Sequence, residues 1–300
     1  MRRISVINIT YVTKGMVVVY LQHMPKHGGG RLHDVQTFRA SCDAGSKDSA
    51  TAWITATKTL KSPDEVAYNS FAHVMEGLLA NEPVVIKLQT IGRLSNREAT
   101  VAAHFRTNPR RNIVVPICQF QCPHDLVKWQ KPLPVRAGSR GLCDGNKVSD
   151  PMLSVLVMEY LPYNLIDYLV SKAVTDDVRV SILKQLGFTL IQLHLVDRMS
   201  HGDIGSGNMM LDVGEPRRND YVIRGKTWSV NTHGVEPILI DFQLSTAYTG
   251  RPSKDILVAE IAIAYDVLAR WVHWDLVDLI KKVEGSKTID SLMLLIDGIV

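Results

Sequence analysis

Three side chains in the second half of the sequence, Asp203, Asn208 and Asp241, carry oxygen atoms that suit magnesium and phosphate chemistry. Asp203 and Asn208 stand five positions apart in a glycine-containing segment, and Asp241 follows the apolar run 238–240. Two carboxylates and an amide oxygen are hard ligands of the kind that Mg²⁺ prefers, and Mg²⁺ often binds substrate phosphates. Phosphoryl transfer also needs a cation on the phosphates and a carboxylate aimed at the nucleophile. The spacing therefore favours a phosphoryl-transfer site.

A lysine inside an apolar run could supply the cation. Lys87 lies in the run 84–88, which is typical of a buried strand, and Pro83 stands just before it. Ser95 as N-cap, with Glu98 three positions later, predicts a helix start with a capping box. From the residues alone two alternatives stay open. Lys87 could lie on an edge strand with its ammonium in solvent, and Glu98 could be only a capping residue.

The surrounding pattern predicts an α+β fold. Helical spacing follows Ser95 up to Asn108-Pro109, and it returns after Tyr160 for most of the second half. Further strands are predicted at 113–120, 153–158, 209–211 and 238–240, with a long loop at 121–150 and a polar insertion at 213–236. A strand-rich first half and a helix-rich second half predict two lobes of different class with a cleft between them.

The composition narrows the class of protein. Hydrophobic residues make up 46% and charged residues 21%, which is typical of a globular domain, and the basic residues behind the net charge of +4 are scattered. Four irregularly spaced cysteines favour a reducing compartment over a disulfide framework. The most apolar segment, 256–272, contains Glu260, Asp266 and Arg270, so it predicts a buried helix instead of a membrane span. We expect a soluble intracellular protein of the cytoplasm or nucleus, with neither membrane nor nucleic acid indicated as a partner.

In their order along the chain, these residues resemble the protein kinases over about residues 66–270. The segment 201–208, His-Gly-Asp-Ile-Gly-Ser-Gly-Asn, is similar to the catalytic loop, and Asp241-Phe242-Gln243 is similar to the metal-binding tripeptide. The resemblance implies that Asp203 accepts the proton of the substrate hydroxyl and that Asn208 and Asp241 hold Mg²⁺. It also implies that Lys87, paired with Glu98, steadies the phosphates of ATP.

The same resemblance implies a nucleotide pocket. The segment 157–161 is similar to the hinge that contacts adenine, which assigns nucleotide binding to Met158, Glu159 and Leu161. Segment 68–74 stands where kinases carry the glycine-rich loop, and Val74 fits that framework. The residues in place of the loop glycines are Ala67, Asn69 and Ala72. The alternative is that this segment is an unrelated strand.

Other departures bear on regulation and rate. Gly202 replaces an arginine found in kinases that are regulated by phosphorylation, Gly205 replaces a catalytic-loop lysine, and Gln243 replaces a glycine. The segment 244–254 is too short for a long activation loop. In this short segment, and in His-Gly-Asp followed by Asn-Met-Met-Leu, the chain resembles the small atypical kinases of the KEOPS complex, and the vaccinia-related kinases share His-Gly-Asp-Ile. The resemblance implies that Asp255, on the following helix, braces the catalytic loop.

The prediction is therefore an ATP- and Mg²⁺-dependent phosphotransferase, a serine/threonine protein kinase whose protein substrate and any regulatory protein partner stay unnamed. Two alternatives remain, a pseudokinase that acts as a scaffold and a small-molecule kinase. The expected organisation is an N-terminal extension or enlarged lobe at 1–65, a β-rich N-lobe at 66–158 and a short, mainly helical C-lobe at 159–300.

Two minor sites are weaker hypotheses. Thiolates and imidazole are zinc ligands, so a zinc site could form from Cys118, Cys122, His124 and Cys143, although buried or free cysteines are the simpler reading. An acidic partner or RNA could bind the basic residues of the insertion, which are Arg217, Arg218, Arg224 and Lys226. A solvated hairpin is the simpler reading of the insertion.

Overall fold

The structure is a computed structural model that describes residues 8–9, 19–20, 65–68, 73–79, 82–114, 116–123, 152–250 and 252–300. Within them the chain forms two compact units. Residues up to Asn108 and from Pro116 to Tyr160 form the first unit, and Pro109–Val114 with Leu161–Val300 form the second. Strands and helices both contribute to the described chain, so the fold class is α+β, as the sequence predicts.

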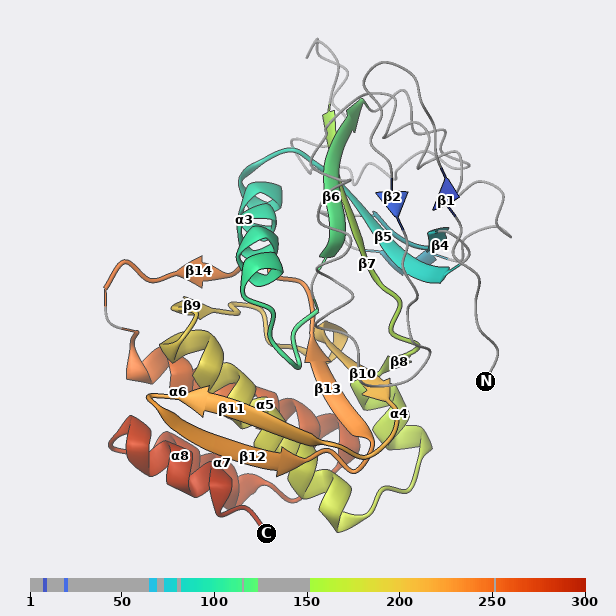
Figure 1. The fold of residues 1–300 in the computed structure, drawn as a ribbon. Coiled ribbons are helices and arrows are strands. Elements are labelled where there is room, and N and C mark those ends of the chain that lie inside the picture. Colours follow the sequence, from blue (N-terminus) through green and yellow to red (C-terminus); the bar gives the residue numbers. More distant parts are fainter. Residues whose placement is uncertain are drawn as a thin grey trace, which may run out of the picture. The chain divides into compact units, whose positions relative to one another are not determined.

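An antiparallel sheet is the centre of the first unit (Figure 1). Its five strands lie in the order β3, β4, β5, β7, β6. Their bounds are β3 Glu65–Tyr68, β4 His73–Leu79, β5 Glu82–Thr90, β6 Pro116–Pro123 and β7 Met152–Glu159, and β1 Asn8–Ile9 pairs separately with β2 Val19–Tyr20. The strands predicted at 84–88 and 153–158 are confirmed as β5 and β7. Of the predicted loop 121–150, the first three residues belong to β6 and the rest lies outside the described residues.

Helix α3, Arg93–Thr107, contacts β6 of the same unit. Its buried face repeats at helical spacing, with Glu98, Ala102 and Phe105 among its members. The predicted start at Ser95 was wrong, because the helix begins at Arg93. The Ser95 hydroxyl instead accepts from the backbone N–H of Gly92 at 2.8 Å and so satisfies a donor just before the first turn. Glu98 is therefore not a capping residue.

The segment 109–114 belongs to the second unit although its sequence neighbours belong to the first. Arg110 fixes it by donating from Nε and Nη2 to the two carboxylate oxygens of Asp197, at 3.0 and 2.8 Å. Asn112 has a left-handed φ of 61°, and its backbone carbonyl accepts from Leu239 N at 2.8 Å. The single strand predicted over 113–120 is therefore wrong at its start, since Ile113 bridges to Leu239 and β6 begins at Pro116.

Five α-helices lie in the described part of the second unit (Figure 1). They are α4 Leu165–Ser171, α5 Asp176–Leu195, α6 Lys254–Val272, α7 Val277–Glu284 and α8 Ile289–Asp297. The Thr175 hydroxyl caps α5 and the Ser253 hydroxyl caps α6. α5 packs on α6 and α8, and the buried Tyr265 hydroxyl of α6 donates to Leu183 O of α5 at 2.9 Å. The apolar segment 256–272 is thus a packed helix, and none of the described helices is long and apolar enough to cross a membrane.

Short paired strands flank the loops 201–208 and 240–245 of the second unit. β13 Val235–Leu239, β10 Met209–Val213 and β8 Tyr163–Asn164 form an antiparallel sheet in that order. β9 Met199–Ser200 pairs with β14 Thr246–Ala247. The two ends that matter for chemistry are the start of β10, which follows Asn208, and the end of β13, which precedes Asp241.

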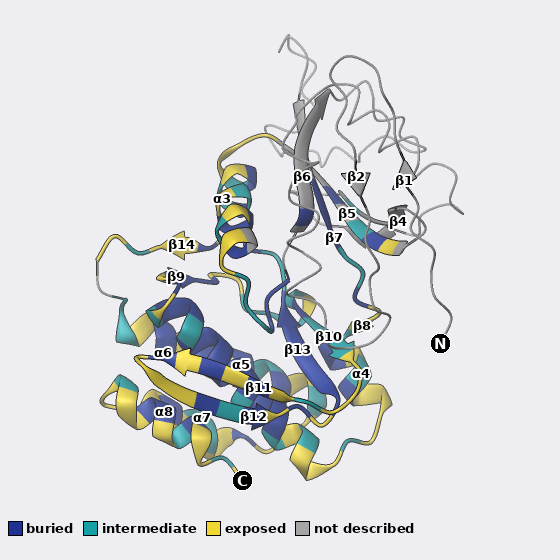
Figure 2. Cartoon of the chain, in the orientation of Figure 1, coloured by how far each residue is buried: buried dark blue, intermediate teal, exposed yellow. Residues whose placement is uncertain are grey.

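The insertion 213–236 contains a hairpin of β11 Arg218–Ile223 and β12 Lys226–Asn231 that contacts α5. Alternate residues point inward, so one face is buried (Figure 2). Tyr221 and Trp228 on that face lie 5.5 and 5.4 Å from the ring of Phe188 in α5. A wholly solvated hairpin is therefore wrong, because the inner face is part of the hydrophobic core.

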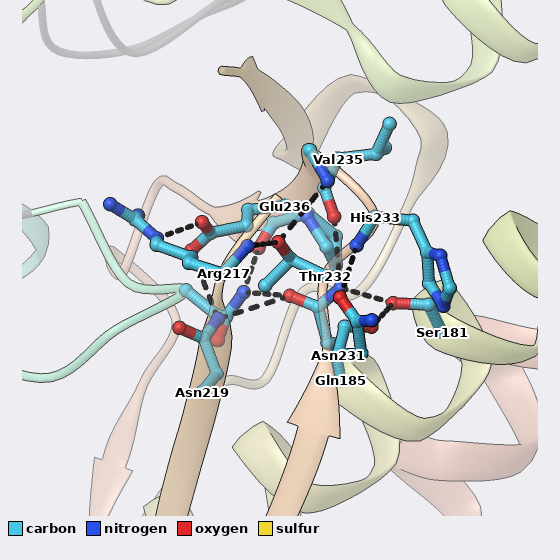
Figure 3. A network of polar contacts seen from close by, with 12 residues as sticks. Ser181, Gln185, Arg217, Asn219, Asn231, Thr232, His233, Val235 and Glu236 are labelled. Carbon is cyan, nitrogen blue, oxygen red and sulfur yellow. Dashed lines mark hydrogen bonds and ion pairs between the residues drawn. The ribbon is translucent and has the colours of Figure 1, made fainter. Parts of the chain in front are cut away.

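A buried polar network joins the hairpin to α5 and β13 (Figure 3). Gln185 of α5 donates to Val235 O at 2.9 Å and accepts from Asn219 and Asn112. Asn219 also donates to Glu236 at 3.0 Å, and Glu236 forms a buried ion pair with Arg217. The network anchors β13, the strand that leads to Asp241.

Candidate active site

The Lys87–Glu98 pair lies wholly within the first unit. Lys87 Nζ is 3.0 Å from Glu98 Oε1, and the two side chains are only 3% and 6% exposed. β5 is an interior strand, and Lys87 pairs across it with Val74 of β4 and Leu156 of β7. The edge-strand alternative for Lys87 is therefore wrong. A buried ammonium held by a carboxylate keeps a fixed position, which suits a phosphate contact.

The other predicted nucleotide contacts are distributed over both units. Val74 of β4 is half-buried beside Lys87, and Met158 and Glu159 end β7, opposite Val85 and Val84. Leu161 is buried in the second unit. Of the segment compared with the glycine-rich loop, residues 69–72 lie outside the described residues. The geometry of this loop therefore stays a prediction.

Asp203 and Asn208 are brought together by the loop between them. Asn208 Nδ2 donates both to the Asp203 backbone oxygen, at 2.8 Å, and to Asp203 Oδ2, at 2.9 Å. The amide nitrogen of Asn208 therefore serves Asp203, and its amide oxygen is the atom suited to a cation. Asp203 is exposed, so its carboxylate can reach a substrate hydroxyl.

Asn164, at the start of α4, braces this loop. Its Oδ1 accepts from the backbone N–H groups of Ile166 and Asp167, which caps α4, at 2.9 and 3.3 Å. Its Nδ2 donates to Ser206 O at 2.7 Å, in the middle of the loop. One carboxamide thus joins a helix end to the segment between Asp203 and Asn208. No pattern of residue types predicts this contact, because it depends on the pairing of β8 with β10.

Asp241 follows the buried strand β13 and has a left-handed φ of 63°. The preceding Ile240 donates its N–H to Asn208 O at 3.1 Å, so the chain enters Asp241 directly beside Asn208. Gln243 N donates to Asp241 Oδ1 at 3.4 Å. An L-residue at positive φ costs energy that the surrounding bonds must offset, and such positions cluster at functional sites.

His201 links the two loops as a neutral imidazole. Its Nε2 lies 2.9 Å from Ile240 O, so this nitrogen carries the proton, and Nδ1 accepts from Asp203 N at 3.3 Å. Burial lowers the pKa of His201 despite the opposing effect of Glu260. Its ring also packs on Phe242 with centroids 4.6 Å apart. His201 is therefore a structural link between the Asp203 and Asp241 loops.

Gly202 is required by backbone geometry. Its φ is +81°, a region that side chains disfavour, and a Cβ there would clash with the carbonyl group of Leu244. The loop after Asp241 thus packs directly on the loop 201–208. Ser245 Oγ donates to His201 O at 3.1 Å, and Tyr248 N donates to Arg198 O at 2.7 Å. The predicted short segment is folded against β9 in this way.

Glu260 of α6 holds the start of the loop. Its carboxylate accepts from Gly202 N at 2.6 Å, from His201 N at 3.1 Å and from His194 Nε2 at 2.8 Å. Burial alone would raise the pKa of Glu260, but these hydrogen bonds outweigh it and hold the pKa below its ordinary value. The Tyr248 hydroxyl extends the chain of contacts by bonding His194 Nδ1 at 2.9 Å.

The expectation that Asp255 braces the loop was wrong. The Asp255 side chain is 91% exposed and lies near Lys254, whereas Glu260, on the buried face of the same helix, makes the contacts. Glu260 was visible in the sequence as an acid inside an apolar helix. Its partners were not, because two of them are backbone N–H groups.

The basic residues of the insertion are engaged within the second unit. Arg217 pairs with Glu236, Arg218 with Asp220 and Arg224 with Asp290, and Lys226 lies 3.6 Å from the centroid of the Trp228 ring. Arg218 and Arg224 remain exposed within these pairs, so the RNA or acidic-partner site stays a prediction. The zinc hypothesis stays untested, because the side chains of Cys118 and Cys122 are among those not described and His124 and Cys143 lie outside the described residues.

Magnesium would have to be held by few protein ligands. In the described part of the chain, no group of three or more His, Cys, Asp or Glu side chains could hold a metal ion. Asn208 and Asp241 provide one amide oxygen and one carboxylate on loops joined by the Ile240–Asn208 bond. This small set of hard oxygens fits Mg²⁺, which keeps waters and completes its shell with substrate phosphates.

Comparison with known proteins gives limited similarity. No protein-family model and no curated protein matches the sequence. Among 1679 matching chains of solved structures is one described as "WaaP in complex with acyl carrier protein". It is 10% identical, with a TM-score of 0.49, and the match covers 82% of this chain and 86% of that chain. The contacts described above therefore carry the functional conclusion.

Proposed function

We propose that the protein is an ATP- and Mg²⁺-dependent phosphotransferase with a kinase-like fold, acting on serine or threonine hydroxyls of a protein. The observation that carries the proposal is the junction of Asp203, Asn208 and Asp241. Asn208 holds Asp203 through its amide nitrogen and receives Ile240 N through its backbone oxygen. One residue thereby ties the candidate base to the strand that delivers the second metal ligand.

Each residue then has a defined role. Asn208 Oδ1 and the Asp241 carboxylate would hold Mg²⁺, which neutralises charge on the phosphates as the γ-phosphoryl group moves. Lys87, held by Glu98, would contact the phosphates, and Val74, Met158, Glu159 and Leu161 would contact the nucleotide. Asp203 would orient the acceptor hydroxyl and take its proton. The new bond from the acceptor oxygen to the γ-phosphorus would form as the bond from that phosphorus to ADP breaks.

Two observations favour second candidate functions, a scaffold role and transfer to a small molecule. A Cβ at Gly205 would meet no atom within 4 Å, so the place of the loop lysine is open. Loss of that cation favours slow transfer or a scaffold. The segment after Asp241 is short and pairs with β9, and a small molecule is therefore the second candidate acceptor.

Labelled phosphate transfer tests the proposal. Wild-type protein with Mg²⁺ and γ-labelled ATP should label itself or a generic protein acceptor. Asp241→Ala should abolish transfer with little change in the unfolding midpoint, and Asp275→Ala, which alters an exposed aspartate of the same unit, should transfer normally. ATP binding without transfer by the wild type would favour the scaffold, and full activity of Asp241→Ala would refute the assignment.

A further inference from the structure

Glu98 receives a second side-chain donor besides Lys87. Gln89 Nε2 donates to Glu98 Oε2 at 3.0 Å, while Lys87 Nζ donates to Oε1 at 3.0 Å. Each carboxylate oxygen therefore has its own donor from β5. Gln89 is only 3% exposed, and Glu98 is 4% exposed.

The strand geometry explains why both donors reach one carboxylate. Residues two apart on a strand point to the same face, so Lys87 and Gln89 face α3 together. β5 is held on both sides near this point, by β4 at Lys87 and by β7 at Lys87 and Gln89. The two donors are thus fixed relative to each other by the sheet. A carboxylate held at both oxygens cannot rotate about its axis as one held at a single oxygen can.

The second donor, the Gln89 amide, is neutral, and its lack of charge suits the site. Lys87 and Glu98 already balance each other as a buried ion pair, so a further cation at position 89 would compete with Lys87 for Glu98. A carboxylate at 89 would compete with Glu98 for Lys87. An amide adds a hydrogen bond to a charged group without adding charge.

We infer that Gln89 is a positioning residue, which holds Glu98 in the orientation that presents Lys87 to the phosphates. The inference rests on the proposed phosphotransferase function. The first unit then sets its own strand-to-helix ion pair through two side chains of β5.

Four proteins test the inference: the wild type, Gln89→Met, Glu98→Gln and the double variant. Methionine matches the length of glutamine and removes the donor. Gln89→Met should raise the KM for ATP by about tenfold in the wild-type background, the scale of one hydrogen bond to a charged group. In the Glu98→Gln background the same change should have less than about a threefold effect, because the charged acceptor is gone. Asn96→Ala, on the exposed side of α3, is the matched control and should behave as wild type.

Equal effects of Gln89→Met in both backgrounds, or a wild-type KM for Gln89→Met, would overturn the inference. A fifth variant, Gln89→Glu, gives an independent reading. Its KM defect should shrink as the pH is lowered, since protonation of one carboxyl removes the competition for Lys87. A pH-independent defect would contradict the account of charge.

Failure of the proposed function gives a different result. If the wild type neither binds nor turns over ATP, the phosphotransferase proposal fails, and the four proteins are then compared by urea unfolding alone. Non-additive changes in unfolding midpoint between positions 89 and 98 would still support the contact. Additive changes would overturn it.

Discussion

Two buried glutamates, one in each unit, hold candidate functional residues of their own unit by different means. Glu98 in the first unit accepts from side chains, Lys87 and Gln89. Glu260 in the second unit accepts from the backbone of Gly202 and His201 and from the His194 ring. Glu98 therefore positions a charge, whereas Glu260 positions a stretch of main chain. The two should respond differently when their partners are changed.

The largest expected effect is a difference in how far a second substitution restores the unfolding free energy that the first one removes. Glu98→Leu leaves the Lys87 ammonium buried without its carboxylate, and Glu260→Leu leaves buried backbone donors without theirs, so each should cost about 3–5 kcal/mol of unfolding free energy. Adding Lys87→Met to Glu98→Leu should restore much of the loss, since an apolar pair can replace a buried ion pair. Urea unfolding of the three variants measures this.

Glu260→Leu should have no such rescue, because the N–H groups of Gly202 and His201 cannot be removed by mutation of a partner side chain. Adding His194→Leu should leave most of the loss in place. Asp255→Asn on the same helix is the matched control and should change the unfolding free energy by less than about 0.5 kcal/mol. Full rescue by His194→Leu would show that the ring, and not the backbone, is the main partner of Glu260.

A smaller effect should appear in the pH dependence of stability. Burial alone would raise the pKa of Glu260, but the hydrogen bonds that its carboxylate accepts hold the pKa below the ordinary value of 4.5. As the pH falls below 4.5, the unfolded chain takes up this proton before the folded protein does, so the stabilisation present above that pH is lost on acidification. The difference in thermal midpoint between wild type and Glu260→Gln should therefore narrow between neutral pH and acid. A constant difference would contradict the proposed ionisation of Glu260.

The smallest expected effect concerns Asn164, which combines both modes of contact in one side chain. Asn164→Asp keeps the oxygen that caps α4 but loses the donor to Ser206 O. Aspartate is as good an N-cap as asparagine, so the stability of α4 should be preserved. The rate of phosphate transfer should fall by about threefold to tenfold, the scale of one hydrogen bond. Asn164→Ser, which also caps without donating to Ser206 in the same way, should give a similar rate, and a wild-type rate in both would exclude the bracing role.

The same contrast explains what the sequence could predict. Lys87 in an apolar run, Glu98 on the next helix, Asp203 five positions before Asn208, and Asp241 after an apolar run are patterns of residue type and spacing. The strands and the α+β class follow from the same periodicity. These features depend on side chains, so the sequence carries them.

The features that were missed depend on the backbone or on distant pairing. The family resemblance assigned the bracing role to Asp255, and no residue type in the sequence marks the backbone N–H groups of His201 and Gly202 as partners of Glu260. The inner face of the hairpin, with Tyr221 and Trp228, alternates in the sequence, but only its contact with α5 shows that this face is buried. The segment 109–114 joins the second unit through Asn112 and Leu239, which are distant in the chain.

The central claim is that Asp203, Asn208 and Asp241 perform phosphoryl transfer, and Asp203→Asn tests it most directly. This substitution keeps the size of the side chain and an oxygen that can accept from Asn208, but it removes the base. Mass spectrometry of an acceptor protein incubated with Mg²⁺ and ATP should show added phosphate with wild type and none with Asp203→Asn, while both proteins gain thermal stability from Mg²⁺ and ATP. Equal phosphorylation by the two proteins, or none by the wild type, would contradict the claim.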